Sequence, residues 1–215
     1  MRILTLVLLT ILVASFAIPV ANAERKTENV ILITYDGLRH QEVFGGIDQR
    51  LIHTSRGGVE DVVDLRERFI RDSEEDQRAA LLPFFWSVIA KKGKVWGDPD
   101  SNSAVMVKNV RLFSYPGYNE ILTGSPDPDI KSNAKKPNKN ITILEWVNQQ
   151  PGFRGKVEAF CSWDVFPFII NEVRSGVPVN AGWEEFTGMG DPDKQEQLNR
   201  LTRELPHNWA GIRFD

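Results

Sequence analysis

The chain has 215 residues, of which 26 are Lys or Arg and 29 are Asp or Glu, and its formal net charge is −3. Hydrophobic residues make up 41% and charged residues 26%, which is typical of a soluble globular protein and unlike a disordered chain, a multi-span membrane protein or a collagen-like repeat. Because nucleic-acid binders concentrate positive charge on one face, this mildly acidic balance argues against nucleic acid as a partner.

The N-terminus has the pattern of a secretory signal peptide. A short positive start and an apolar run over 3–18 are followed by Pro19 and by the small-residue motif Ala21-Asn22-Ala23. The pattern predicts a signal peptide over 1–23, cleaved before the next residue. The protein is therefore expected to be secreted or periplasmic and to have no stable membrane anchor.

From residue 24 to residue 215, short apolar and β-branched runs alternate with helical patterns. The predicted strands are 29–35, 94–96, 104–113 and 156–160. The predicted helices are 60–78, 81–92, 117–122, 141–149, 165–173 and 191–204, and 125–140 is expected to be a long surface loop. Asn140 begins a glycosylation sequon but also stands where the N-cap of the helix over 141–149 is expected. This alternation predicts an α/β domain with a mainly parallel sheet sandwiched by helices.

Two polar residues directly follow predicted strands. Asp36 follows 29–35, and Ser114 follows 104–113 at the start of a predicted helix. In an open parallel sheet, ligands bind outside the carboxyl ends of the strands. A carboxylate there can hold a divalent cation, and a serine at a helix N-terminus can become a nucleophile if a metal or a base takes up its charge. Taken alone, each signal is weak, because an Asp-Gly pair after a strand is more often a turn than a ligand, and a Ser before a helix is usually an N-cap.

In combination, these residues lie in segments that resemble the alkaline phosphatase superfamily. Residues 30–39 (Val-Ile-Leu-Ile-Thr-Tyr-Asp-Gly-Leu-Arg) are similar to its first metal-binding strand. Residues 113–119 (Phe-Ser-Tyr-Pro-Gly-Tyr-Asn), with Leu122-Thr123-Gly124, are similar to its nucleophile segment, most closely in the nucleotide pyrophosphatase/phosphodiesterase branch. Ser132-Asn133 stands where that branch carries an Asn that binds the transferred phosphoryl group. The resemblance covers about 29–168.

The resemblance implies an alkaline phosphatase-like fold and a metal-dependent phosphoester hydrolase, a phosphatase or phosphodiesterase, that forms a phospho-serine intermediate. Asp36 would bind one of two divalent metal ions, expected to be zinc. Ser114 would be the nucleophile and would also touch the metals, and Asn133 would donate to a non-bridging phosphoryl oxygen. The expected partner is a small-molecule phosphoester, which the exposed lysines of the 125–140 loop could attract.

Several alternatives stay open. Tyr118 stands where the formylglycine motif of sulfatases has Arg, which argues against a sulfatase, and a phosphoglycerate mutase-like enzyme is another alternative within the superfamily. The family's further ligands include an Asp-His pair, whereas none of the histidines here (His40, His53 and His207) follows an Asp. We therefore expect the chain to be the N-terminal part of a longer enzyme and inactive alone. The other explanation is a non-catalytic binding protein that retains the fold.

Overall fold

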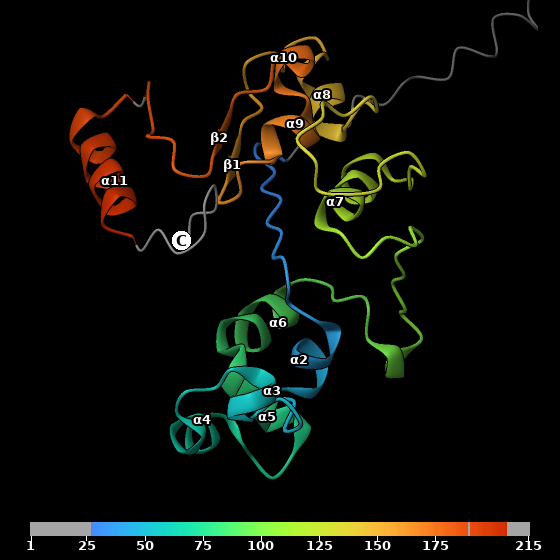
Figure 1. Ribbon diagram of the computed structural model, residues 1–215, viewed down its shortest axis with the longest axis vertical. Coiled ribbons are helices and arrows are strands. Elements are labelled where there is room, and N and C mark those ends of the chain that lie inside the picture. The colour runs from blue at the N-terminus through green and yellow to red at the C-terminus, as the bar shows by residue number, and fades with distance from the viewer. Residues whose placement is uncertain (1–26, 189, 206–215) are drawn as a thin grey trace, which may run out of the picture. The chain divides into compact units, whose positions relative to one another are not determined.

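The structure is a computed structural model that describes residues 27–188 and 190–205 (Figure 1). The described residues belong to two units, which meet between Asp36 and Gly37. The predicted signal peptide, 1–23, lies outside the described residues.

Helices form most of the regular structure, and the first group of them lies between His40 and Lys92. This group comprises α2 (His40–Gly45), α3 (Thr54–Gly57), α4 (Val62–Phe69), α5 (Glu74–Leu81), the π-helix η1 (Phe85–Ile89) and α6 (Ala90–Lys92), and is followed by the short η2 (Pro99–Ser101). Helix α5 contacts α2, α4 and η1. Trp86 stabilises this packing, since its Nε1 donates to Val43 O at 3.1 Å and the Arg78 guanidinium lies 4.0 Å from its ring centroid.

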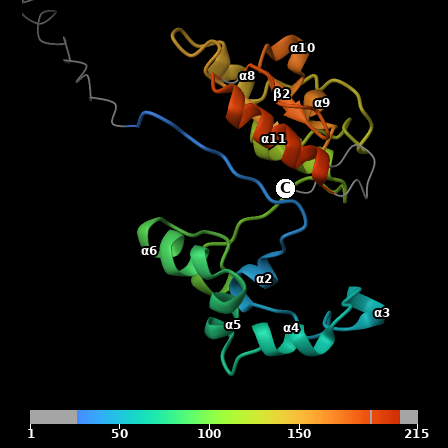
Figure 2. The same cartoon turned by 90° about the vertical axis from the view of Figure 1, so that its left-hand side faces the viewer.

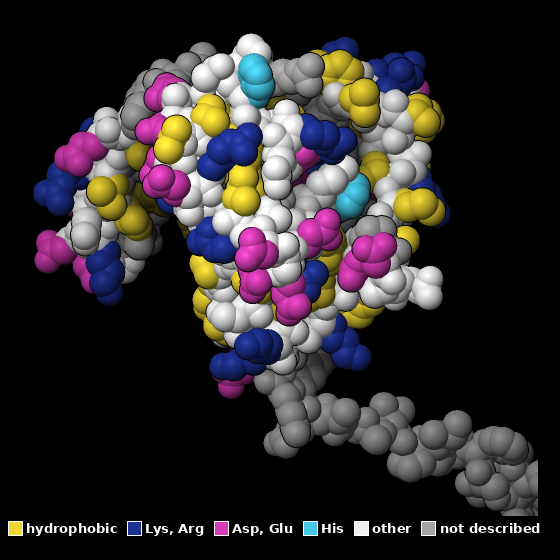
Figure 3. Space-filling model, turned by 90° about the horizontal axis from the view of Figure 1, so that it is seen from below, with side chains coloured by type: hydrophobic (Ala, Val, Ile, Leu, Met, Phe, Trp, Pro, Cys, Tyr) yellow, Lys and Arg dark blue, Asp and Glu magenta, His cyan; other side chains and the backbone are white. Residues whose placement is uncertain are grey.

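The single helix predicted over 60–78 is instead two helices, α4 and α5. The first ends because Ile70 takes an extended backbone, and the second starts at Ser73, whose hydroxyl accepts from Asp76 N at 3.0 Å. The charged side chains of this stretch are exposed, as expected, apart from the half-buried Arg78, and the face seen in Figure 3 mixes basic and acidic side chains. The run of charges is therefore a solvated surface.

The second group contains the parallel strands. Its elements are α7 (Ser114–Thr123), α8 (Ile143–Asn148), β1 (Ala159–Cys161), α9 (Phe166–Ile170), α10 (Glu172–Ser175), β2 (Val179–Ala181) and α11 (Pro192–Glu204). Strand β1 pairs in parallel with β2, with Ala159 opposite Val179, and α9 and α10 connect the two strands. Helix α11, drawn in red in Figure 2, follows this β-α-β unit in the sequence.

The hydrophobic core lies between α7, α9 and β2. Its buried members are Tyr115, Tyr118, Leu122, Val165, Ile169, Ile170, Val177, Val179 and Ala181. Helices together with a small parallel sheet are compatible with the predicted α/β class. The core therefore packs against the helix that begins at Ser114.

Three strand predictions differ from the structure. Residues 29–35, 94–96 and 104–113 form no strand, and their apolar side chains are largely exposed, as at Val30 (85%) and Leu112 (100%). A strand exists only when a second strand pairs with its backbone, and the described residues provide no such partner here. The prediction over 156–160 is confirmed only as the three-residue β1, and β2 was not predicted.

Candidate functional site

Ser114 is the first residue of α7. Phe113 precedes it with an extended backbone (φ −132°, ψ 146°) and provides no side-chain cap. Because Pro116 has no N–H, Ser114 and Tyr115 carry the first amide groups that the helix leaves available. The Ser114 side chain is half-buried, and no described residue hydrogen-bonds to its hydroxyl. The helix terminus therefore presents a hydroxyl at the positive end of the helix dipole.

Asn133 meets this helix terminus. Tyr115 N donates to Asn133 Oδ1 at 3.0 Å, across 18 residues of sequence. A backbone N–H can only donate, so this bond determines which end of the Asn133 amide faces the helix. The Nδ2 group has no acceptor among the described residues and is left to donate to a ligand. The structure thus brings together the segment of Ser114 and the predicted phosphoryl donor.

The side-chain hydroxyl of Tyr115 also holds the loop over 125–140 in place. It donates to Lys136 O at 2.7 Å and lies 3.1 Å from Phe168 O. The residue is only 2% exposed, and burial raises the pKa of its hydroxyl to about 12, so the group stays a donor at neutral pH. A single side chain therefore connects α7, the loop and α9.

A cluster of asparagines fixes the rest of the loop. Asn138 Nδ2 and Asn140 Nδ2 donate to Asn119 Oδ1 at 3.1 and 3.0 Å, and Asn140 Nδ2 also donates to Asp127 Oδ2 at 2.7 Å. The loop predicted over 125–140 has no regular structure, as expected, yet Asn138 is buried (2% exposed). The N-cap of α8 is Thr142, not Asn140, because the Asn140 amide belongs to this cluster.

Glu120 holds the segment that leads into Ser114. Its carboxylate accepts from Lys108 N at 2.7 Å and from both nitrogens of Asn109. These hydrogen bonds, led by the one from the Asn109 side chain, lower the pKa of the Glu120 carboxyl. Neither Glu120 nor the hydroxyl of Tyr115 was singled out from the sequence, because most of their partners are backbone groups, which leave no residue-type signal.

The surroundings of Asn133 are basic. Lys131, Lys135, Lys136 and Lys139 are all exposed, and of these Lys135 forms an ion pair with Asp164. The exposed lysines give the loop a positive potential that would attract an anion. This field, the helix terminus and the Asn133 amide all suit a phosphoryl group.

Asp36 belongs to the other unit. It is the last residue of that unit, and its side chain is exposed. The site geometry described above therefore involves Ser114 and Asn133 and does not include Asp36. Within the described ranges, no group of three or more His, Cys, Asp or Glu side chains is placed to hold a metal ion. The described residues around Ser114 do not form a metal-ligand set.

No family model, curated protein or solved structure matches the chain. Among residues 27–188 and 190–205, no helix combines the length and the apolar character needed to cross a bilayer.

Proposed function

We propose that the protein is an exported phosphoester hydrolase of the alkaline phosphatase superfamily, with Ser114 as its nucleophile and Asn133 as a donor to the phosphoryl group. The hydrogen bond from Tyr115 N to Asn133 Oδ1 is the observation that supports this most directly. It joins the two motifs that the family resemblance singles out, although they lie far apart in the sequence. A serine hydroxyl can attack a phosphoester, and a helix N-terminus and an oriented amide donor can stabilise the charge on the phosphoryl oxygens.

The chain's own groups would act as follows. The bond from Ser114 Oγ to phosphorus forms as the bond from phosphorus to the leaving oxygen, in line with it, breaks, and the hydroxyl proton passes through water to the leaving oxygen, which yields a phospho-serine and an alcohol. Water then attacks phosphorus, Ser114 Oγ regains a proton, and phosphate is released, or a phosphomonoester when the substrate is a diester. Asn133 Nδ2 and the amide of Ser114 donate to the non-bridging oxygens, where negative charge must be stabilised. Because Tyr115 N already orients the Asn133 amide, little reorganisation is needed as the reaction proceeds.

The proposal includes two divalent metal ions, zinc by resemblance, with Asp36 and Ser114 among their ligands. Such ions supply charge stabilisation for the attacking and leaving oxygens. Each zinc ion takes about four ligands, so two protein ligands do not complete a two-metal site. We therefore expect the 215 residues alone to have no useful hydrolase activity, and activity to require the product of the complete reading frame.

The test is the Ser114→Ala variant of the protein expressed from its complete reading frame. Turnover of p-nitrophenyl phosphate and bis-p-nitrophenyl phosphate should fall by about 10³-fold or more, with the fold unchanged by circular dichroism. Ser132→Ala is the matched control, because the Ser132 hydroxyl accepts only a local bond from Ala134 N and the variant should keep its activity. Near-full activity in Ser114→Ala would remove Ser114 from the nucleophile role. Binding of phosphate without turnover in the unchanged protein would favour the non-catalytic binding protein.

A further inference from the structure

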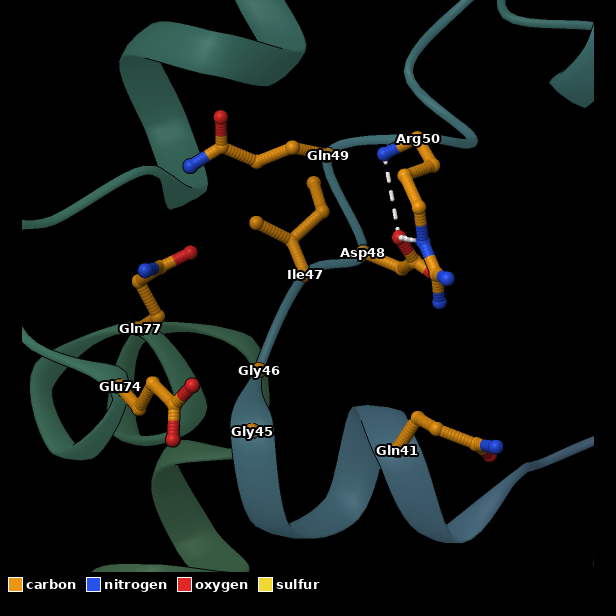
Figure 4. A pocket seen from close by; sticks show the side chains of 9 residues that line it. All are labelled: Gln41, Gly45, Gly46, Ile47, Asp48, Gln49, Arg50, Glu74 and Gln77. Carbon is orange, nitrogen blue, oxygen red and sulfur yellow. Dashed lines mark hydrogen bonds and ion pairs between the residues drawn. The ribbon is translucent and has the colours of Figure 1, made fainter.

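A cavity of about 260 Å³ opens between the end of α2, the loop that follows it and the start of α5 (Figure 4). Its lining residues lie between Gln41 and Gln77, so none belongs to the site at Ser114 and Asn133. The cavity is lined mainly by polar side chains, which include three primary amides and three charged groups. This composition suits a small polar ligand better than an apolar one.

One wall of the cavity holds a buried acceptor without a donor. Gln77 is only 8% exposed, and its Oε1 has no hydrogen-bond partner among the residues that the structure describes. Figure 4 shows the Gln77 amide extending from α5 on the side of Gln49 and Ile47. Buried carbonyl oxygens are almost always paired, since leaving one unpaired forfeits its hydration. The position therefore calls for a donor from a ligand or a water molecule.

The same wall carries a second acceptor. Glu74 lies one helical turn before Gln77 on α5, which puts both side chains on one face of the helix. The Glu74 carboxylate is exposed and forms no ion pair or hydrogen bond with any described residue. A ligand that satisfies both residues must donate, and a positive charge on it would be favoured.

On the opposite wall of the cavity, the two charged side chains pair with each other. Arg50 Nε donates to Asp48 Oδ1 at 2.9 Å and Arg50 Nη2 donates to Asp48 Oδ2 at 2.8 Å. These hydrogen bonds hold the pKa of the Asp48 carboxyl far below its usual range. Asp48 and Arg50 thus cancel each other's charge, and Glu74 is left as the net negative charge among the lining residues.

We propose that this cavity binds a small aliphatic amine in its protonated form, with the ammonium group donating to Gln77 Oε1 and to the Glu74 carboxylate. An ammonium group has three donors and no acceptor, so it can donate to Gln77 Oε1 and to the Glu74 carboxylate at the same time. The wall is rigid at this point: the backbone of Gly46 packs so closely on α5 that a Cβ there would lie 2.6 Å from Gln77 Cβ. The amine site is independent of the proposed hydrolase activity.

The experiment titrates the full-length protein with ethanolamine and follows binding by calorimetry and by NMR shifts of the Gln77 side-chain amide. Ethanolamine should saturate one site. Tetramethylammonium has the same charge but no N–H, and ethylene glycol has no charge, so both should bind at least about tenfold more weakly. Equal binding of tetramethylammonium, or no saturable binding of ethanolamine, would overturn the proposal and leave water as the partner of Gln77.

Substitutions distinguish binding at this cavity from a general effect of the negative charge at the start of α5. Glu74→Gln should weaken ethanolamine binding by about tenfold, because the charge-assisted bond is lost. Glu75→Gln removes the same charge from the next residue, which does not line the cavity, and should leave binding unchanged. An equal loss in both variants would contradict a defined site. Gln77→Met should abolish the preference for ethanolamine over tetramethylammonium, provided that its circular dichroism is unchanged.

Discussion

Glu120 accepts hydrogen bonds from both nitrogens of Asn109, at 2.9 Å from the backbone N and 2.8 Å from Nδ2. This carboxylate lies on the helix that starts at Ser114, and its two partners lie on the segment that leads into that helix. Helix α7 therefore holds the segment that precedes it in the chain, although the apolar side chains of that segment are largely exposed.

We expect protection of the Lys108 and Asn109 amides from hydrogen exchange to depend on the charge of Glu120. The pKa of Glu120 is lowered from its ordinary value of 4.5, so the stabilisation is complete above that value and is lost as the pH falls through the lowered pKa. Exchange rates, corrected for the intrinsic rate, should show this loss only at pH values below 4.5, the ordinary pKa of the group. Glu120→Gln should lose protection already at pH 7, whereas Glu60→Gln should match the unchanged protein. Full protection in Glu120→Gln would contradict the anchoring role.

Two substitutions at Asn133 should distinguish the role of its acceptor, Oδ1, from the role of its donor, Nδ2. Asn133→Asp keeps an oxygen to accept from Tyr115 N but replaces the free donor by an anion, so kcat should fall by about 10²–10³-fold in the protein from the complete reading frame. Asn133→Ala also removes the loop contact and should lower thermal stability as well. If Asn133→Asp keeps full activity, the amide is structural and does not contact the phosphoryl group.

Gly46→Ala should destabilise the protein. The residue has φ +82°, and an added Cβ would lie 2.6 Å from Gln77 Cβ and 2.7 Å from Arg78 N. We expect the free energy of unfolding to drop by about 2–4 kcal/mol, measured by urea denaturation. Gly45→Ala is the matched control, since its Cβ would meet nothing within 4 Å. Similar stability of the two variants would mean that α2 and α5 do not pack this closely.

Arg174→Met should be far more costly than a comparable change at the surface. Arg174 pairs with the buried Glu145 at 2.7 Å and donates to the carbonyl groups of Asn138, Lys139 and Asn140. Its removal leaves a buried carboxylate unpaired, and we expect a loss of about 3–5 kcal/mol in unfolding free energy. Arg203→Met breaks only exposed ion pairs and should cost less than about 1 kcal/mol. Equal losses would refute the structural role of the buried pair.

Asp36→Asn should lower the metal content of the protein expressed from its complete reading frame, because the proposed two-metal site loses a carboxylate ligand. Elemental analysis after dialysis gives the metal-to-protein ratio. Asp72→Asn, which changes another exposed carboxylate, should leave the ratio unchanged. Unaltered metal in Asp36→Asn would exclude this residue as a ligand.

The helices were largely predictable because their signals are local. Asp191 is the N-cap of α11 and accepts from the backbone N–H of Lys194, three residues later, and such a cap can be recognised in the sequence. The strands were less predictable, since a run such as 29–35 has strand character but becomes a strand only through a partner elsewhere in the chain. Strand β2 follows Pro178 and has only three residues, so no alternation pointed to it.

The candidate site, too, was predictable only in part. The order of the motifs made Ser114 and Asn133 candidates, and their roles in catalysis stay predictions. The contacts of Glu120 and of the Tyr115 hydroxyl depend on backbone groups 11 to 53 residues away, which residue types do not reveal. The unpaired acceptor of Gln77 arises from close packing and has no counterpart in a sequence pattern.

The two-ended attachment of Tyr115 has a mechanical consequence. Because its hydroxyl reaches Phe168 O while its amide holds Asn133, the loop cannot shift without disturbing α9. Strain introduced in the core, for example by Ile169→Ala, would be transmitted to the orientation of the Asn133 donor. Such a substitution, although it lies outside the site, would slow the chemical step and lower kcat, with little effect on KM.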